Sequence, residues 1–305
     1  MKAGTNLEKV LEAGRFAVTA EAGPPKGTSA QVILRKAELL HHCCDAVNVT
    51  DNQTAIVRMS SFAGCLLLKQ RSVDPIMQVT VRDRNRIAIQ SDILGAAALG
   101  IGNILCLSGD HQKFGNHPGS KNVFDLDSIQ LIQTLKKMRD EKKFLCGEDI
   151  SGEVPVFIGA AENPFADPFE FRVTRLGKKI KAGVDFIQTQ AIYDVPRFIQ
   201  WMKMVTDRGF DRQVHILAGI IPIRSAGMAR YMRDYVPGIR MPDEIVTRME
   251  SAKNAKEEGL KISLEIIEQV KEIPGVHGVH IMAVGWEEVV PQIIERAGLL
   301  PRPAL

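Results

Sequence analysis

The chain has 305 residues, of which 45% are hydrophobic and 25% charged, as in an ordinary globular protein. Its net charge of +3 is too small to indicate a nucleic-acid partner, and no apolar stretch reaches the ~18 residues of a membrane span. The five cysteines include no Cys-x-x-Cys pair, and the first residues lack the apolar core of a signal peptide. We therefore expect a cytoplasmic protein without a metal site or disulfides.

Apolar, β-branched runs alternate along the chain with segments of helical period. The runs predict eight buried strands, at 16–21, 45–50, 74–81, 103–108, 154–161, 184–190, 214–221 and 278–284. Helices are predicted at 29–42, 52–70, 85–100, 127–143, 168–182, 195–209, 225–235 with 242–271, and 286–297. Continuous apolar strands alternating with amphipathic helices indicate a parallel sheet covered by helices. Eight such units in one chain favour a closed (β/α)8 TIM barrel over an open sheet, as a single domain spanning residues 1–305.

Polar side chains stand where several predicted strands end. Glu21 follows the first strand directly, and Gly23-Pro24-Pro25 then stops that strand. A barrel carries its chemistry at the carboxyl ends of its strands, so we expect these residues on one rim. They are Glu21, Thr50, Gln78, Asp110, Glu162, Asn163, Gln190, Pro222, Arg224 and the 282–287 stretch. Amides, a hydroxyl and two carboxylates suit a flat heterocycle rich in donors and acceptors, such as a pterin or a flavin.

The sequence lacks the residues that several classes of enzyme require. No strand ends in lysine, which disfavours a Schiff-base aldolase, and no His-x-His lies on a strand, which disfavours a metal-dependent hydrolase. His215 and His280 stand alone, early in their strands. Neither a phosphate-binding Gly-x-x-x-x-Gly-Lys-Ser/Thr loop nor a Gly-x-Gly-x-x-Gly turn after the first strand is present.

Four segments narrow the chemistry further: Glu21-Ala-Gly-Pro-Pro-Lys26, Cys106-Leu-Ser-Gly-Asp110, Thr189-Gln190 with Asp194-Val195, and Ala218-Gly-Ile-Ile-Pro222. They resemble, in order and spacing, segments of the methylenetetrahydrofolate reductase family. The family counterparts are Glu-x-x-Pro-Pro, Leu-Arg-Gly-Asp, Thr-Gln-(three residues)-Asp-Val and Pro-Gly-Ile-x-Pro. The resemblance extends over nearly the whole chain.

The resemblance implies a barrel that holds a flavin, FAD or FMN, and reduces 5,10-methylenetetrahydrofolate to 5-methyltetrahydrofolate. Glu21 would be the general acid that assists protonation at N10. Asp110 would contact the pterin edge and stabilise the cationic intermediate, and Gln190 would hydrogen-bond the pterin. The resemblance places the flavin against Thr50, Gln78, Leu107, Ser108, Gly109, Asp110, Phe124, Asp125, Ala160, Ala161 and Lys179.

Two departures from the family pattern bear on the electron donor. Ser108 replaces the family's arginine before Gly-Asp, which removes one expected contact to the flavin phosphate. Ala226 stands where the family often has a phenylalanine, so an aromatic platform for a nicotinamide nucleotide is absent. We therefore expect an enzyme that uses NAD(P)H poorly or takes its electrons from a redox partner protein. We also expect the chain to form an oligomer or to be a subunit of a larger complex.

Other readings stay open at this stage. Glu21 could pair with Lys26, Asp110 could be a turn residue, and Gln190 could be an interior amide. Lys179 could belong to a solvated face, and Phe124 to the core. At the level of function, the alternatives are a pterin-binding methyltransferase, which needs no flavin, and a non-catalytic flavin or folate subunit of a redox complex.

Overall fold

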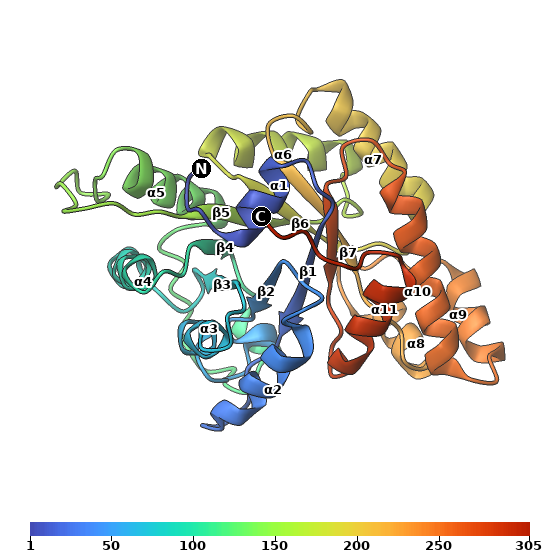
Figure 1. The fold of residues 1–305 in the computed structure, drawn as a ribbon. Helices are drawn as coiled ribbons and strands as arrows, with labels where there is room; N and C mark the ends of the chain where they lie inside the picture. Colours follow the sequence, from blue (N-terminus) through green and yellow to red (C-terminus); the bar gives the residue numbers. More distant parts are fainter.

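The computed structural model describes residues 1–305 and consists of a closed barrel of eight parallel strands (Figure 1). Each strand pairs with the next, and β8 pairs with β1 to close the ring. The strands are β1 (Ala17–Ala22), β2 (Ala46–Val49), β3 (Pro75–Thr80), β4 (Asn103–Leu107), β5 (Phe157–Glu162), β6 (Phe186–Ala191), β7 (His215–Ile220) and β8 (Gly278–Ile281). The predicted (β/α)8 barrel is therefore confirmed.

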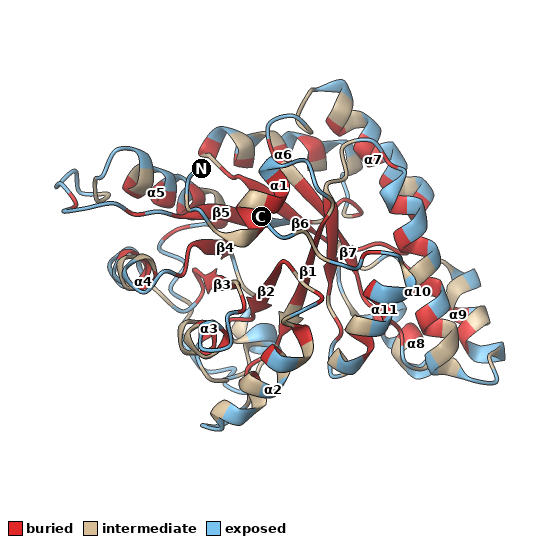
Figure 2. Ribbon diagram, in the orientation of Figure 1, coloured by how far each residue is buried: buried red, intermediate tan, exposed pale blue.

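Helices surround the barrel and bury one face each (Figure 2). They are α1 (Asn6–Glu12), α2 (Ala30–Leu40), α3 (Ser61–Lys69), α4 (Arg86–Ala98), α5 (Ser128–Asp140), α6 (Phe169–Ala182), α7 (Val195–Asp207), α8 (Ala226–Tyr235), α9 (Asp243–Ser251), α10 (Ala255–Lys271) and α11 (Val290–Arg296). Side-chain caps fix several helix starts; Asp127, for example, forms a capping box with Gln130 at α5. None of the helices combines the length and the apolar character needed to cross a bilayer.

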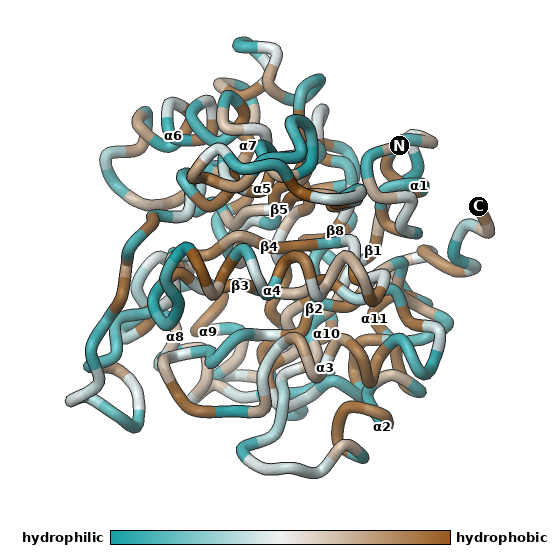
Figure 3. The backbone as a smooth tube through the Cα atoms, turned by 90° about the vertical axis from the view of Figure 1, so that its left-hand side faces the viewer, coloured by the Kyte–Doolittle hydropathy of each residue, from teal (hydrophilic) through white to brown (hydrophobic).

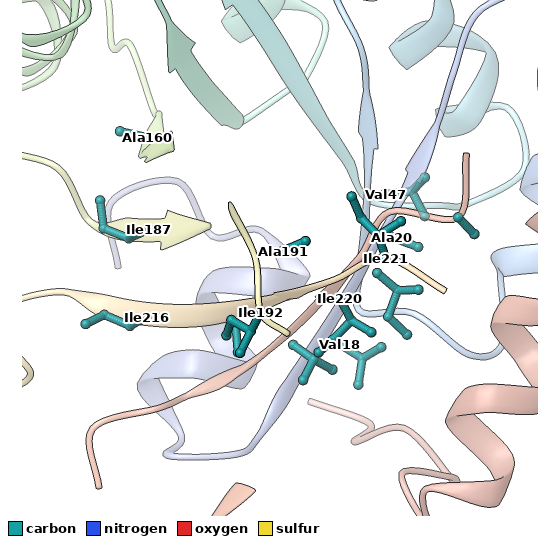
Figure 4. Close-up of a cluster of buried hydrophobic side chains, with 14 of the residues drawn as sticks. Val18, Ala20, Val47, Ala160, Ile187, Ala191, Ile192, Ile216, Ile220 and Ile221 are labelled. Atoms are coloured by element: carbon teal, nitrogen blue, oxygen red, sulfur yellow. The ribbon is translucent and has the colours of Figure 1, made fainter. Parts of the chain in front are cut away.

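The main core lies between the outer face of the strands and the helices. It contains 70 buried residues, and Figure 4 shows part of it, including Val18, Ala20 and Ala160. Successive residues of a strand point to opposite faces of the sheet. Because Val18, Ala20 and Ala160 point outward, their neighbours Thr19, Glu21 and Ala161 point into the barrel. In Figure 3 the apolar strand segments lie at the centre of the molecule. The helices around them alternate between hydrophilic and hydrophobic residues along the chain.

A second, smaller core closes the amino-terminal end of the barrel. Leu7, Val10 and Leu11 of α1 pack there against inward-facing residues of seven strands, among them Phe157 and Phe186. The ring of Phe186 reaches across to β5, where a Cβ at position 159 would lie only 2.2 Å from it, so a glycine is required. The sequence prediction missed α1, because seven residues are too few to display a helical period.

Two predicted helices begin later than expected. Within 52–70, Asn52, Thr54 and Ala55 have positive φ values of 45°, 58° and 55°, so the chain forms a short 3-10 turn (η1, Gln53–Ala55) before α3. Within 286–297, a second short turn (η3, Glu287–Val289) precedes α11. The region 225–271 forms three helices rather than two. In each case a stretch of non-helical backbone interrupts a segment whose apolar residues recur with the period of a helix.

Candidate active site

A cavity of about 510 Å³ opens at the carboxyl ends of the strands. Only five of its 25 lining residues are hydrophobic, so it is suited to a polar ligand. Nine of the residues that the family resemblance assigns to the site line it: Glu21, Gln78, Leu107, Ser108, Gly109, Asp110, Ala161, Lys179 and Gln190. The cavity thus brings together the two acids from β1 and from the loop after β4.

Glu21 occupies an inward position near the end of β1, with 13% of its side chain exposed. Its Oε1 accepts a hydrogen bond from Gln78 Nε2 at 3.3 Å and lies 3.8 Å from His280 Nε2. No hydrogen bond or ion pair joins Glu21 to Lys26, so the alternative in which these two residues pair with each other is wrong. The carboxyl group is held at the cavity wall by two polar side chains from β3 and β8.

A buried polar network lies below Glu21 and holds His280 in place. Gln188 and Asn48 exchange two side-chain hydrogen bonds of 2.7 and 3.0 Å across the barrel. Gln188 Nε2 also donates to Thr19 Oγ1 at 3.2 Å, and that hydroxyl lies 2.9 Å from His280 Nδ1. Because every member has a partner, the network can rigidify the interior at little cost.

Asp110 lies on a loop that is fixed by backbone contacts. Gly109, with φ 84°, turns the chain at the end of β4. The buried guanidinium of Arg82 donates to Asp110 O at 2.9 Å and to Asn52 O at 3.2 Å, which ties the loops after β2 and β4 together. Thr54 N donates to Asp110 Oδ2 at 3.0 Å. The remaining carboxylate oxygen is free to accept a hydrogen bond from a ligand.

The opposite wall of the cavity is formed by β5, β6 and helix α6. Lys179 is buried and forms an ion pair with Glu162 at 2.6 Å. Burial lowers the pKa of Lys179, while Glu162 opposes that shift. Gln190 Oε1 accepts from Ala191 N at 2.9 Å, which leaves its amide N–H groups without an acceptor in the protein. Arg172 and Arg175 also line this wall.

Four residues predicted to contact a flavin do not line the cavity. Thr50 is buried with no hydrogen-bond partner for its hydroxyl, and Ala160 faces the outer core (Figure 4). Phe124 is 43% exposed, and Asp125 pairs with Arg86 at 2.8 Å, which lowers the pKa of Asp125 to about 2. Their contact with a ligand stays a prediction.

Sequence reasoning missed several cavity residues, above all His280, Gln188, Arg172 and Arg175. His280 and Gln188 lie within strands, where their inward direction was available from the alternation of side chains but was not used. The two arginines lie three residues apart on a helix rich in surface charge, and nothing in the local pattern distinguishes them from solvated residues.

A family profile described as methylenetetrahydrofolate reductase matches residues 6–298. Methylenetetrahydrofolate reductase 2 of Schizosaccharomyces pombe is 26% identical over 257 residues, which cover 80% of this chain and 39% of the relative. Methylenetetrahydrofolate reductase 1 of the same yeast is 28% identical over 238 residues, covering 75% of this chain and 36% of the relative. The chain therefore spans less than two fifths of the length of these relatives.

Solved structures agree on the fold. A Clostridium thermocellum protein that binds two copies of 5-methyl-5,6,7,8-tetrahydrofolic acid superposes with a TM-score of 0.67 at 13% identity. That match covers 97% of this chain and all of the other. A 2,3-dimethylmalate lyase gives a TM-score of 0.53 at 14% identity, covering all of this chain and 88% of the lyase. Identities this low indicate a shared barrel alone, whereas the family profile covers nearly every residue: the chain belongs to the methylenetetrahydrofolate reductase family.

Proposed function

We propose that this protein reduces 5,10-methylenetetrahydrofolate to 5-methyltetrahydrofolate with a bound flavin. The observation that carries the proposal is that Glu21 and Asp110, from β1 and the loop after β4, line one polar cavity together with Gln78 and Gln190. Membership in the family and the folate bound by the Clostridium thermocellum barrel support a folate substrate.

The cavity residues fit a flavin. The small side chain of Ala161 leaves room for close approach, and Gln78 supplies an amide beside Glu21. The wall also holds a buried polar atom with no partner, Nε of Arg172, as expected where a ligand atom completes the bonding. When bound, the flavin supplies the hydride; the residues of the chain bind, orient and move protons.

Glu21 is the proton donor in this proposal. Gln78 donates a hydrogen bond to Oε1, and the imidazole of His280 lies 3.8 Å from the same oxygen, so Oε2 is left for the substrate or a bridging water. A positioned acid of this kind contributes typically 10²–10⁴-fold to the rate.

Asp110 and Gln190 orient the pterin. The Asp110 carboxylate accepts from ring N–H groups and stabilises positive charge that develops during ring opening. Gln190 has unused amide donors that suit a pterin acceptor.

A single experiment tests the proposed function. The purified protein is examined for visible flavin absorbance, the flavin is reduced without oxygen, and 5,10-methylenetetrahydrofolate is added. We expect reoxidation of the flavin with stoichiometric formation of 5-methyltetrahydrofolate, measured by chromatography and mass analysis. A colourless protein that cannot be reconstituted with flavin, but transfers a methyl group from 5-methyltetrahydrofolate, would instead establish the methyltransferase alternative.

A further inference from the structure

The segment 23–25 directly follows β1 and begins two residues beyond Glu21, so its position constrains where that carboxyl group stands. Its sequence is Gly-Pro-Pro, and the two prolines have no N–H group with which to anchor it. Lys36, on α2, supplies a donor instead, because its Nζ donates to Gly23 O at 2.9 Å. The segment is therefore held through a carbonyl oxygen by a group that lies elsewhere in the chain.

The next two carbonyl groups are held in the same way, from the loop after β2. Arg58 donates a side-chain hydrogen bond to Pro24 O at 3.1 Å. Met59 N donates to Pro25 O at 2.9 Å. Three consecutive oxygens thus have donors from α2 or from the loop after β2, and these donors restrict the backbone just beyond Glu21 to one course.

Lys36 differs from the other two donors because it also binds the segment after β8. Its ammonium group forms an ion pair with Glu287 Oε1 at 2.6 Å, at the start of η3. The side chains of Lys36 and Glu287 are 19% and 15% exposed, so this pair is screened less than a pair on the open surface. Since β8 pairs with β1, one ammonium group joins the ends of two neighbouring strands.

We propose that Lys36 is a positioning residue for Glu21. By holding Gly23 O and the Glu287 carboxylate together, it keeps the end of β1, and with it the carboxyl group of Glu21, in the orientation for proton transfer. Lys36 does not line the cavity, so its effect on the reaction runs through Glu21 rather than through contact with a ligand. The inference rests on the proposed function, in which Glu21 is the acid.

A double-mutant cycle tests whether Lys36 acts through Glu21. Lys36→Met removes the charge and the donor but keeps the length of the side chain, and it is made both with Glu21 present and in the Glu21→Gln background. Each protein is loaded with flavin and reduced, and its reoxidation by 5,10-methylenetetrahydrofolate is followed in a single turnover, which extends to slow variants.

Lys69→Met is the matched control. Lys69 Nζ also donates to a glycine carbonyl, Gly100 O at 2.8 Å, but it does so ahead of β4, at the end of the barrel opposite the cavity. Thermal unfolding followed by circular dichroism establishes that each variant is folded.

We expect Lys36→Met to lower the maximal rate of reoxidation by about tenfold when Glu21 is present, inside the ~10²-fold loss that a small misplacement can cause. The folate concentration that gives half of that rate, and the affinity for flavin, should not change, because Lys36 does not line the cavity. In the Glu21→Gln background the substitution should have no further effect, since the group that Lys36 positions is gone. Lys36→Arg should recover part of the rate, because it keeps the charge and a donor. Lys69→Met should match the unmodified chain.

An equal loss of rate in both backgrounds, or a Lys36→Met variant indistinguishable from Lys69→Met, would overturn the inference while leaving the proposed function standing. Absence of folate-dependent reoxidation in the unmodified chain would overturn both. If Lys36→Met does not fold, Glu287→Gln is taken through the same cycle, because it removes the carboxylate charge that holds Lys36. It should lower the rate by about threefold, the scale of one partly exposed ion pair, and only where Glu21 is present. An unchanged rate in that variant would then overturn the inference.

Discussion

At the scale of single residues, the environment of Glu21 decides what it can do. The carboxyl group is attached to a strand rather than a loop, and its Oε1 is approached by Gln78 and His280 from two other strands. Such support limits the side chain to one orientation, which a positioned acid requires.

Replacing Glu21 with glutamine removes the proposed proton donor but keeps the size of the side chain. We expect folate reduction to fall by about 10²-fold or more, since general acid catalysis is lost. Flavin binding and the reduction of the flavin by a chemical reductant should stay unchanged. Single-turnover kinetics with reduced enzyme measure the first effect, and the absorption spectrum measures the second. Loss of flavin from this variant would place Glu21 in a different role.

We propose that His280 positions Glu21, because its ring lies 3.8 Å from Glu21 Oε1 and 2.9 Å from Thr19 Oγ1. We expect His280→Ala to lower the rate of folate reduction by up to about 10²-fold, the scale of a small misplacement of a reacting group. The pH profile of that rate should shift as well, whereas the affinity for flavin should not. Partial recovery in His280→Gln would support positioning, and an unaltered pH profile in the alanine variant would argue against it.

At the scale of elements, α1 closes the barrel at the end opposite the site. The buried side chains of Leu7, Val10 and Leu11 fill this end, which forms the floor of the barrel. Leu7 N also donates a hydrogen bond to Asp74 Oδ2 at 3.0 Å. Both termini lie near this end, beside α1 (Figures 1 and 3). The floor contributes stability and stands apart from the rim that carries the candidate active site.

Truncation of a floor side chain tests that division. Leu7 is fully buried, so Leu7→Ala should lower the free energy of unfolding by about 3 kcal/mol through lost burial and the cavity left behind. Urea denaturation measures the change, and Ile87→Ala on the exposed surface of α4 serves as the control. Flavin affinity of the folded variant should equal that of the unmodified chain; a large change there would show that floor and rim are coupled.

A histidine pair next to the floor makes stability depend on pH. The rings of His215 and His277 lie 5.1 Å apart, and His277 Nδ1 accepts from Ile216 N at 3.2 Å, which requires an unprotonated nitrogen. Burial lowers the pKa of both residues below the ordinary value of 6.5, and the charge of His215 adds to the effect on His277.

The sign of the dependence follows from proton binding. As pH falls through the ordinary histidine range the unfolded chain takes up protons that the folded chain does not, so stability decreases on acidification. We expect the urea midpoint to fall between about pH 7.5 and 5, and to fall less steeply in His277→Gln, whose amide oxygen can replace the acceptor. An identical slope in that variant would mean that other groups control the acid transition.

At the scale of the whole molecule, the rim of the barrel carries a polar cavity, and a donor of electrons to a flavin bound there would have to reach it. Ala226 begins α8, where the family often has an aromatic residue, so a nicotinamide ring would find no stacking platform there. We expect NADH to reduce the bound flavin far more slowly than dithionite or a reduced viologen dye does. Stopped-flow absorbance measures both rates. Reduction by NADH at catalytic rates would rule out dependence on a separate redox protein.

The order of strands and helices could be predicted from the sequence, because hydrophobic period is a local property of the chain. The same holds for the placement of Glu21 and Asp110 at strand ends, since glycine and proline mark those ends. Seven residues were too few for α1 to be predicted, and left-handed backbone at Asn52 and Thr54 shortened a predicted helix.

The tertiary structure decided which side chains meet. Which side chains meet across the barrel depends on how all the strands are aligned with one another, and the pattern within one strand does not give that alignment. Register brings His280 to Glu21, and the packing of α6 against β5 leaves Lys179 neutralised by Glu162 while Arg172 and Arg175 stay without an anion. The sequence by itself therefore determined the barrel and the two acids at its rim, whereas the charges left available to a ligand were decided only when distant strands and α6 came together.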